Sequence, residues 1–247
     1  MVNKLRKANV ERVPKSDFPY FAEILDDMEN FCKIIGKQSK KNQILMINSV
    51  NVRLVSIIEN SIKGVISEVI NIYDLDPKKI LKEDSIQIDL DILNHMKTES
   101  YSKGNIIIAH LDRMNPRIID DTMSRINKLD FFRWYEKVKE TTGVGEFYPL
   151  LNNMNKTRND IMHNLVDSED SQKDLIKKIQ AVTQFIFDLE LLTKLNIGLF
   201  DKNMSQINTE KIAKQLFPDE SPSKSLPRFK KITEKYRKEF TPNAKRY

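Results

Sequence analysis

Several residue types and patterns that other protein classes need are scarce in this chain of 247 residues. Its 6 glycines and 9 prolines are too few for the closely spaced turns of a β-sandwich or β-barrel. The single cysteine, Cys32, excludes an intramolecular disulfide. No run approaches the roughly 18 apolar residues of a membrane span, and the first residues lack the apolar segment of a signal peptide. We therefore expect a cytoplasmic protein with no membrane contact.

Histidine is equally scarce, which bears on metal binding. His95, His110 and His163 lie far apart and form no HxH or HExxH pair, so we expect no metal centre and no cofactor. We expect His95 and His110 to be structural. Cys32 lies in an apolar helical pattern and should pack as a small apolar side chain.

The charge of the chain is unevenly distributed. There are 41 basic and 35 acidic residues, a net charge of +6. Residues 224–247 carry nine basic and two acidic residues, and residues 1–15 carry five and one, so the rest of the chain is net negative. Basic terminal segments suit a phosphate backbone, which they bind through counterion release, although a solvated tail without a partner is the alternative.

Apolar periodicity predicts four long amphipathic helices, which a helical bundle would bury together. We expect them at about 17–36, 42–73, 129–158 with a break at Gly143, and 169–196. Asp74, Asp76 and Pro77 should end the second helix. Asp167 or Ser168 should cap the fourth. In the aromatic segment FFRWYE, Trp134 and Tyr135 are adjacent and should not both face inward.

The remaining segments lie outside this four-helix pattern. Residues 77–128 are less regular, and we expect an insertion of short helices and loops there. After residue 200, Pro218, Pro222 and Pro227 precede the basic amphipathic stretch FKKITEKYRKEF. We therefore expect an all-α fold: a bundle of four to five helices over residues 1–200, with an irregular insertion at about 77–128. Residues 201–247 should form a proline-containing basic C-terminal extension outside the bundle core.

One short motif could carry chemistry. The segment KTRNDIMHN spans residues 156–164 and contains Arg158, Asn159 and, four residues after Asn159, His163. In this motif the chain resembles the HEPN superfamily, whose signature is an Arg, often followed by a polar residue, with a His four to six residues later. The resemblance covers about nine residues in motif and roughly residues 17–198 in architecture. It implies a four- or five-helix bundle acting as a metal-independent endoribonuclease, of the toxin or phage-defence class, with Arg158, His163 and Asn159 as its catalytic residues.

These residue types suit RNA cleavage by transesterification. The ribose 2′-OH attacks the adjacent phosphorus, which requires proton transfers and stabilisation of negative charge on the phosphate oxygens. An imidazole such as that of His163 can take or give a proton near neutral pH, and the guanidinium of Arg158 stays charged and can bind two oxygens. Asn159 could orient the phosphate or His163, and Lys156 could contact the RNA backbone.

The spacing of the motif poses a geometric problem. Five residues of ideal helix rotate by about 500°, so Arg158 and His163 should point about 140° apart. Either the helix breaks near Asp160, or one of the two side chains supports a site that the other forms. The resemblance implies a solution by two-fold pairing, in which a homodimer brings both segments to one shared cleft.

Other interpretations remain open. Arg158 could pair with Asp160, Asp167 or Glu169, while His163 satisfies a helix junction. The protein could be a non-catalytic HEPN-like module that binds RNA or a partner protein, or a DNA-binding bundle that uses FKKITEKYRKEF. An antitoxin or another regulatory protein is a further possible partner. In the RNA interpretations the basic tail supplies contacts, which we assign to Lys230, Lys231, Lys235 and Arg237.

Overall fold

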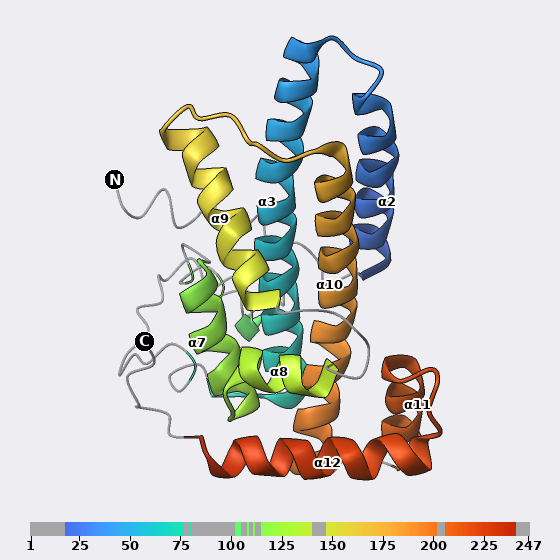
Figure 1. The fold of residues 1–247 in the computed structure, drawn as a ribbon. Helices are drawn as coiled ribbons and strands as arrows, with labels where there is room; N and C mark the ends of the chain where they lie inside the picture. The colour runs from blue at the N-terminus through green and yellow to red at the C-terminus, as the bar shows by residue number, and fades with distance from the viewer. Residues whose placement is uncertain are drawn as a thin grey trace, which may run out of the picture.

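The computed structural model describes residues 18–76, 80, 102–104, 108, 111, 115–139, 147–201 and 206–240. In these residues the chain is helical and contains no strand, which confirms the all-α prediction. The helices (Figure 1) are α2 (Phe18–Ile35), α3 (Lys40–Tyr73), α7 (Pro116–Asn127), α8 (Phe131–Lys139), α9 (Phe147–His163), α10 (Gln172–Phe200), α11 (Gln206–Leu216) and α12 (Pro222–Lys238).

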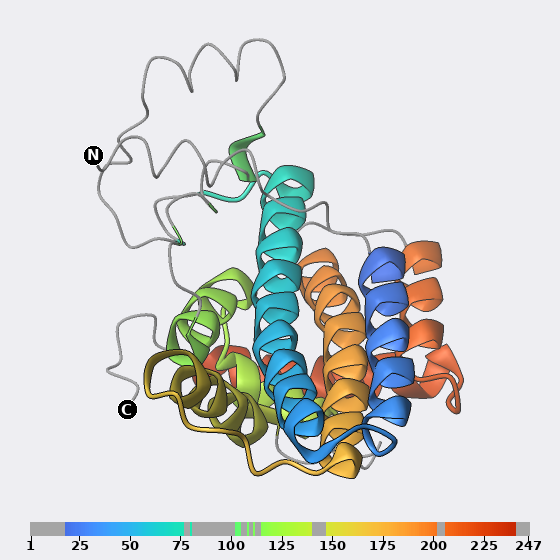
Figure 2. The same cartoon turned by 90° about the horizontal axis from the view of Figure 1, so that it is seen from above.

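Four of these helices form a bundle. The third predicted helix, 129–158, is two separate helices, α8 and α9, of which α9 packs along α3. The long helices α3 and α10 pack together at its centre, α2 packs against both, and α9 packs against α3 on the side away from α2 (Figure 2). Their shared core is apolar and closed to solvent, as Leu25, Leu54, Ile58 and Leu189 illustrate with 0% exposure. Cys32 is buried among them, and burial, helped by the nearby charge of Glu29, raises the pKa of its thiol to about 11. The predicted packing role of Cys32 is thus confirmed.

The ends of these helices follow local capping chemistry. Ser39 caps α3 by accepting a hydrogen bond from the backbone N–H of Asn42, and Asp74 ends it in the left-handed conformation at φ 47°. The prediction for α10 was wrong by one turn. Ser171 is its N-cap, in a capping box with Asp174, and the helix begins at Gln172.

The insertion predicted at residues 77–128 contains a regular helix at its end. Asn115 caps α7 and Pro116 opens it, where the missing N–H of proline has no intrahelical partner. Residues 87–93, which alternate like a strand, lie outside the described residues. Gly104 lies so close to α3 that a Cβ there would stand 2.4 Å from the carbonyl oxygen of Ser67. Glycine is therefore required at this contact.

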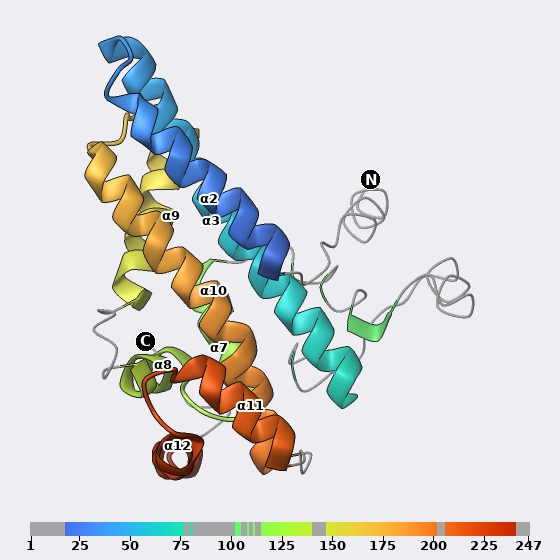
Figure 3. The same ribbon diagram turned by 90° about the vertical axis from the view of Figure 1, so that its right-hand side faces the viewer.

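The expectation that Trp134 and Tyr135 could not both face inward was wrong. Both are buried, at 0% and 1% exposure, because α8 lies between the bundle on one side and α12 on the other (Figure 3). The Trp134 indole packs edge-on against Phe229 and donates a hydrogen bond to Thr233 Oγ1 at 3.1 Å. Tyr135 faces the bundle and packs edge-on against Phe185.

The segment after residue 200, expected outside the bundle core, contributes to it. Phe217, Phe229 and Tyr236 belong to the same buried cluster as the bundle residues. The helix α12 begins at Pro222, seven residues before the amphipathic stretch from which we predicted it, and it accommodates Pro227. Residues 206–240 therefore form a structural layer across one end of the bundle (Figures 1 and 3).

Candidate functional site

The motif lies on a continuous helix. α9 runs from Phe147 to His163 without interruption, so the break considered near Asp160 is absent. The turn after His163 is closed by two backbone hydrogen bonds, in which the N–H groups of Asn164 and Val166 both donate to the carbonyl of Asp160 at 3.1 Å. Because the helix is intact, the angle of about 140° between Arg158 and His163 is retained.

Arg158 continues the buried stripe of α9. It follows Phe147, Leu151 and Met154 at helical spacing on the side that packs against α3. Its guanidinium is partly buried, Nη1 donates to Asn159 Oδ1 at 3.0 Å, and the buried Nε has no hydrogen-bond partner. In the part of the chain that the structure describes, Arg158 forms no ion pair with Asp160, Asp167 or Glu169. The structural interpretation based on those pairs is therefore not supported.

One residue of α3 that sequence reasoning missed, Glu59, lies close enough to interact with Arg158, and Lys63 lies near that carboxylate in turn. Burial raises the pKa of Glu59, and the positive charges of Arg158 and then Lys63 lower it in part. Both α3 residues are partly exposed. Glu59 and Lys63 are four residues apart, and this spacing is also common for a solvent-exposed ion pair on a helix without any functional role. No sequence signal connects them to a motif about a hundred residues later.

His163 points in another direction, into solvent. It is exposed and ends α9, and it lies on the same face as Lys156 and Asp160, at spacings of seven and three residues. Beside this face lies a polar cavity of about 410 Å³, between α9 and the loop after it. Its lining residues are Asn153, Lys156, Thr157, Asp160, Val166, Asp167, Ser168, Glu169 and Asp170. Within one chain, therefore, the structure does not bring Arg158 and His163 together.

A polar network fixes the loop between α9 and α10 on α3. Asn48 Oδ1 accepts from the backbone N–H of Ser168 at 3.0 Å, and Asn51 Nδ2 donates to Ser168 Oγ at 3.1 Å. Lys178, buried on α10, donates to Asp170 at 2.6 Å and to Asn51 at 3.2 Å. Burial alone would raise the pKa of Asp170, but the hydrogen bonds from Lys178, Ser168 and Asn51 outweigh it and lower that pKa. The end of α9 is held firmly by these contacts.

Exposed apolar side chains lie on both sides of His163 in the sequence. Met162 is 52% exposed, Leu165 88% and Val166 55%. Leu165 also has a positive φ of 52°, a conformation that glycine or asparagine adopts more readily than leucine. Neither burial nor backbone geometry explains a leucine at this position, and exposed apolar patches are typical of interaction surfaces. We call Met162, Leu165 and Val166 the apolar patch.

The basic residues assigned to RNA contacts differ in accessibility. Lys230, Lys231 and Lys235 on α12 are exposed, as is Lys156 on α9. Arg237 is partly buried, and its Nη2 pairs with Asp201 Oδ1 at 2.9 Å while Nη1 donates to Asn196 Oδ1 at 3.1 Å. Arg237 therefore attaches α12 to the end of α10, and the three lysines remain available for an external partner.

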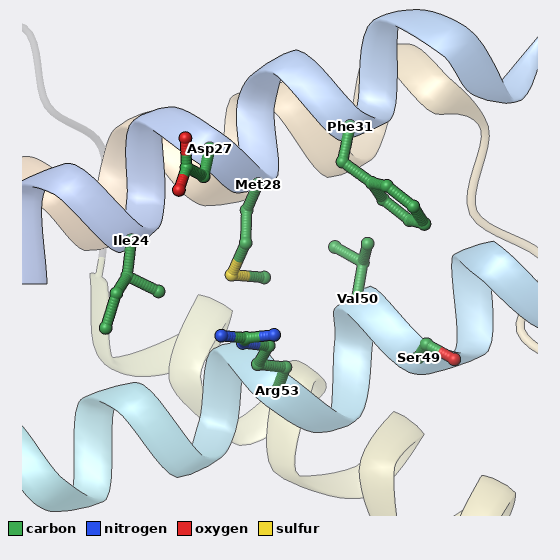
Figure 4. Close-up of a pocket in the computed structure, with 7 residues that line it drawn as sticks. All are labelled: Ile24, Asp27, Met28, Phe31, Ser49, Val50 and Arg53. Atoms are coloured by element: carbon green, nitrogen blue, oxygen red, sulfur yellow. The ribbon is translucent and has the colours of Figure 1, made fainter.

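A second cavity lies between α2 and α3, and Figure 4 shows its lining. It measures about 300 Å³, with Met28, Phe31 and Val50 among its apolar residues and Asp27 and Arg53 as its charges. None of the motif residues lines it. Its charged side chains are a carboxylate and a guanidinium, and it contains no imidazole of the kind that α9 carries.

Comparisons with family models, curated proteins and solved structures returned no match. Among the described residues, no group of three or more His, Cys, Asp or Glu side chains is placed to hold a metal ion. None of the described helices combines the length and apolar character needed to cross a membrane. The residues that could carry a function are therefore those of α9 and its surroundings.

Proposed function

We propose that this protein is a metal-independent endoribonuclease of the HEPN type. The observation that carries the proposal is that one helix presents a guanidinium with an unpartnered buried Nε and, at its exposed end, a solvent-accessible imidazole. The carboxylate of Glu59 lies near the guanidinium. A fixed cation and a group that titrates near neutral pH are what phosphodiester cleavage by an internal nucleophile needs.

The reaction is an intramolecular transesterification. His163 accepts the proton of the ribose 2′-OH, O2′ bonds to phosphorus, and the bond from phosphorus to O5′ breaks as that oxygen takes a proton from a histidine imidazolium of the cleft, so that no net proton is gained or lost. The products are a 2′,3′-cyclic phosphate and a 5′-hydroxyl, with no net change of charge on the phosphate. Arg158 stabilises the negative charge on the non-bridging oxygens, Asn159 orients the guanidinium, and Lys156 binds the RNA backbone.

The active form in this proposal is a two-fold homodimer. One chain points Arg158 towards α3 and His163 into solvent, so a single chain makes a poor clamp for one phosphate. Two α9 ends related by a two-fold axis would place a second arginine and a second histidine in the same cleft. The apolar patch beside His163 supplies the self-complementary surface that such pairing needs.

Cleavage of labelled RNA in excess EDTA tests the proposal. The wild-type protein should retain full activity, whereas Arg158→Ala and His163→Ala should lose about a hundredfold or more. Lys173→Ala, an exposed site on α10, is the matched control and should cut like the wild type. The 3′ product ends should resist phosphatase unless they are first opened by acid. Loss of activity in EDTA together with cleavage by His163→Ala would contradict this mechanism.

The second candidate is a non-catalytic HEPN-like module that binds RNA or a partner protein. The exposed lysines of α12 favour it, because they supply affinity without chemistry. The same experiment separates the two candidates, since this module would retain labelled RNA without shortening it.

Under the first candidate, we also propose a toxin or phage-defence effector in the cytoplasm. Such an effector would need a restraining antitoxin or other regulatory protein, and expression of the wild type but not of His163→Ala should arrest growth.

A further inference from the structure

The exposed face of α12 carries a straight row of positive charge. Four exposed lysines lie within roughly 60° of one another around the helix axis and extend over about 21 Å. We call this row the lysine stripe; its members are Lys224, Lys231, Lys235 and Lys238. Lys230 points about 120° away from Lys224, and two exposed carboxylates, Glu234 of α12 and Glu239 at its C-cap, flank the stripe at about 40° from the nearest lysine.

The stripe is rigid because the opposite face of α12 is anchored. Phe229 and Thr233 are buried against Trp134, and Arg237 is bonded to Asp201 on the other side. Arg133 of α8 lies over the ring of Tyr236 at 5.6 Å, which adds a further positive charge beside the helix. The lysine head groups are therefore presented from a fixed backbone, and binding costs little ordering of the chain.

A polymer of phosphates fits this surface better than a lipid bilayer does. Helices that lie on membranes insert large apolar side chains between the headgroups. No large apolar side chain of α12 is exposed, since its apolar face is covered by α8 and α11. A row of positive charges that extends over about 21 Å is complementary to the repeating phosphates of a polyanion rather than to a single acidic group.

The stripe is far from the proposed catalytic histidine. α9 starts beside α8, where Tyr148 N–H donates to Glu136, and ends at His163. Its 17 residues span about 25 Å. Since α12 lies across the far side of α8 (Figures 1 and 3), the stripe and His163 are at opposite ends of the bundle. At about 3.4 Å per stacked nucleotide, at least about seven nucleotides are needed to connect them.

We infer that the lysine stripe is a second RNA-binding surface, remote from His163, that selects long or structured RNA over short oligonucleotides. This inference rests on the proposed ribonuclease function for its biological meaning, but its physical content is binding alone. An RNA that is bound at His163 and too short to reach α12 gains nothing from the stripe. A longer RNA that binds both regions gains about four phosphate contacts, each contributing about 0.7 to the dependence of log affinity on log salt for a single strand.

The test measures RNA affinity by fluorescence anisotropy over a range of salt concentrations. The proteins carry His163→Ala and are kept in EDTA, so that no cleavage interferes. The stripe variant changes all four lysines of the stripe to glutamine. The control makes the same charge change at four exposed lysines around the α2–α3 turn and the start of α10, which are Lys37, Lys40, Lys41 and Lys177. The probes are RNAs of about 5 and about 24 nucleotides.

For the long RNA, we expect the stripe variant to bind about tenfold or more weakly than the control variant, with a salt slope lower by about three. For the short RNA, the two variants should bind alike. Equal salt slopes for both variants on the long RNA, an equal loss on both RNAs, or stripe-dependent binding only to vesicles containing phosphatidylserine would overturn the inference. A wild type that cleaves no RNA, beside a stripe variant with the expected loss of affinity, would instead remove the ribonuclease proposal and leave the stripe in place.

Discussion

The side chain of Arg158 is held where a guanidinium is costly to place. A buried Nε without a hydrogen-bond partner costs free energy, and the neighbouring Glu59 carries its charge in a partly desolvated setting that raises its pKa. Groups whose placement lowers the stability of the fold are more typical of functional sites than of structural ones. Glu59 is therefore a positioning residue for Arg158 in the proposed reaction.

Replacing Glu59 by glutamine tests that role. The change keeps the shape but removes the negative charge that balances Arg158 and Lys63, so we expect the guanidinium to shift and cleavage to fall by about tenfold. The melting temperature should change little, because the cost of burying a carboxylate disappears with the charge. Asn60→Ala, on an exposed position of the same helix, is the control. A variant that cuts at the wild-type rate, with a shifted melting temperature, would make Glu59 purely structural.

Asp170 gives a prediction about acid stability. Because its pKa is lowered in the fold by Lys178, Ser168 and Asn51 against the effect of burial, its charge stabilises the protein above the unfolded carboxyl pKa of about 3.9. This stabilisation is lost as the pH falls through the lower, folded value. Asp170→Asn should therefore unfold at a lower urea concentration than the wild type at pH 7, and the difference should shrink below about pH 4. A difference that stays constant down to pH 2 would contradict the linkage.

At the scale of elements, the apolar periodicity was enough to place the bundle helices. The stripes predicted at 17–36 and 42–73 became α2 and α3 with bounds within two residues, because each buries a single face. α8 lies within the helix predicted at 129–158, but its burial could not be predicted in this way. It is buried on two faces, so Trp134 and Tyr135 both point inward, and one-sided periodicity fails for such a helix. The packing of α12 on α8 is a long-range contact with no local signal.

That contact predicts the effect of removing α12. A chain ending at residue 220 would expose Trp134 and lose the contacts of Phe229 and Thr233. Losing an aromatic contact of this kind costs about 3–5 kcal/mol, which corresponds to about 10 °C in melting temperature for a protein of this size. Because Trp134 is the only tryptophan, its emission should shift to longer wavelength. The stripe variant loses charge but no burial and should show neither effect; an unchanged melting temperature after truncation would mean that α12 is not part of the core.

At the scale of the whole molecule, the candidate site divides into a part that sequence could predict and a part that only the fold supplies. Arg158, Asn159 and His163 are close in sequence, so a motif predicts them together. Glu59 comes near Arg158 only because α3 and α9 pack side by side. The continuous α9 then keeps Arg158 and His163 apart within one chain, which directs the functional hypothesis towards a pair of chains.

Leu165 offers a test of that pairing in which stability and assembly change in opposite directions. Its φ of 52° costs a leucine about 1 kcal/mol relative to glycine, so Leu165→Gly should raise the stability of the separate chain by about that amount. The same change removes the side chain of Leu165, which at 88% exposure is the most exposed of the apolar patch. The dissociation constant of the dimer, measured by sedimentation equilibrium, should therefore rise about tenfold. Cleavage should fall in proportion to the fraction of dimer. Ile72→Ser, at 56% exposure on the far end of α3, removes apolar surface elsewhere and should leave both properties unchanged. A more stable Leu165→Gly chain with wild-type dimer affinity would exclude the patch from the interface, and a wild type that sediments as a monomer while cleaving RNA at full rate would exclude the shared cleft itself.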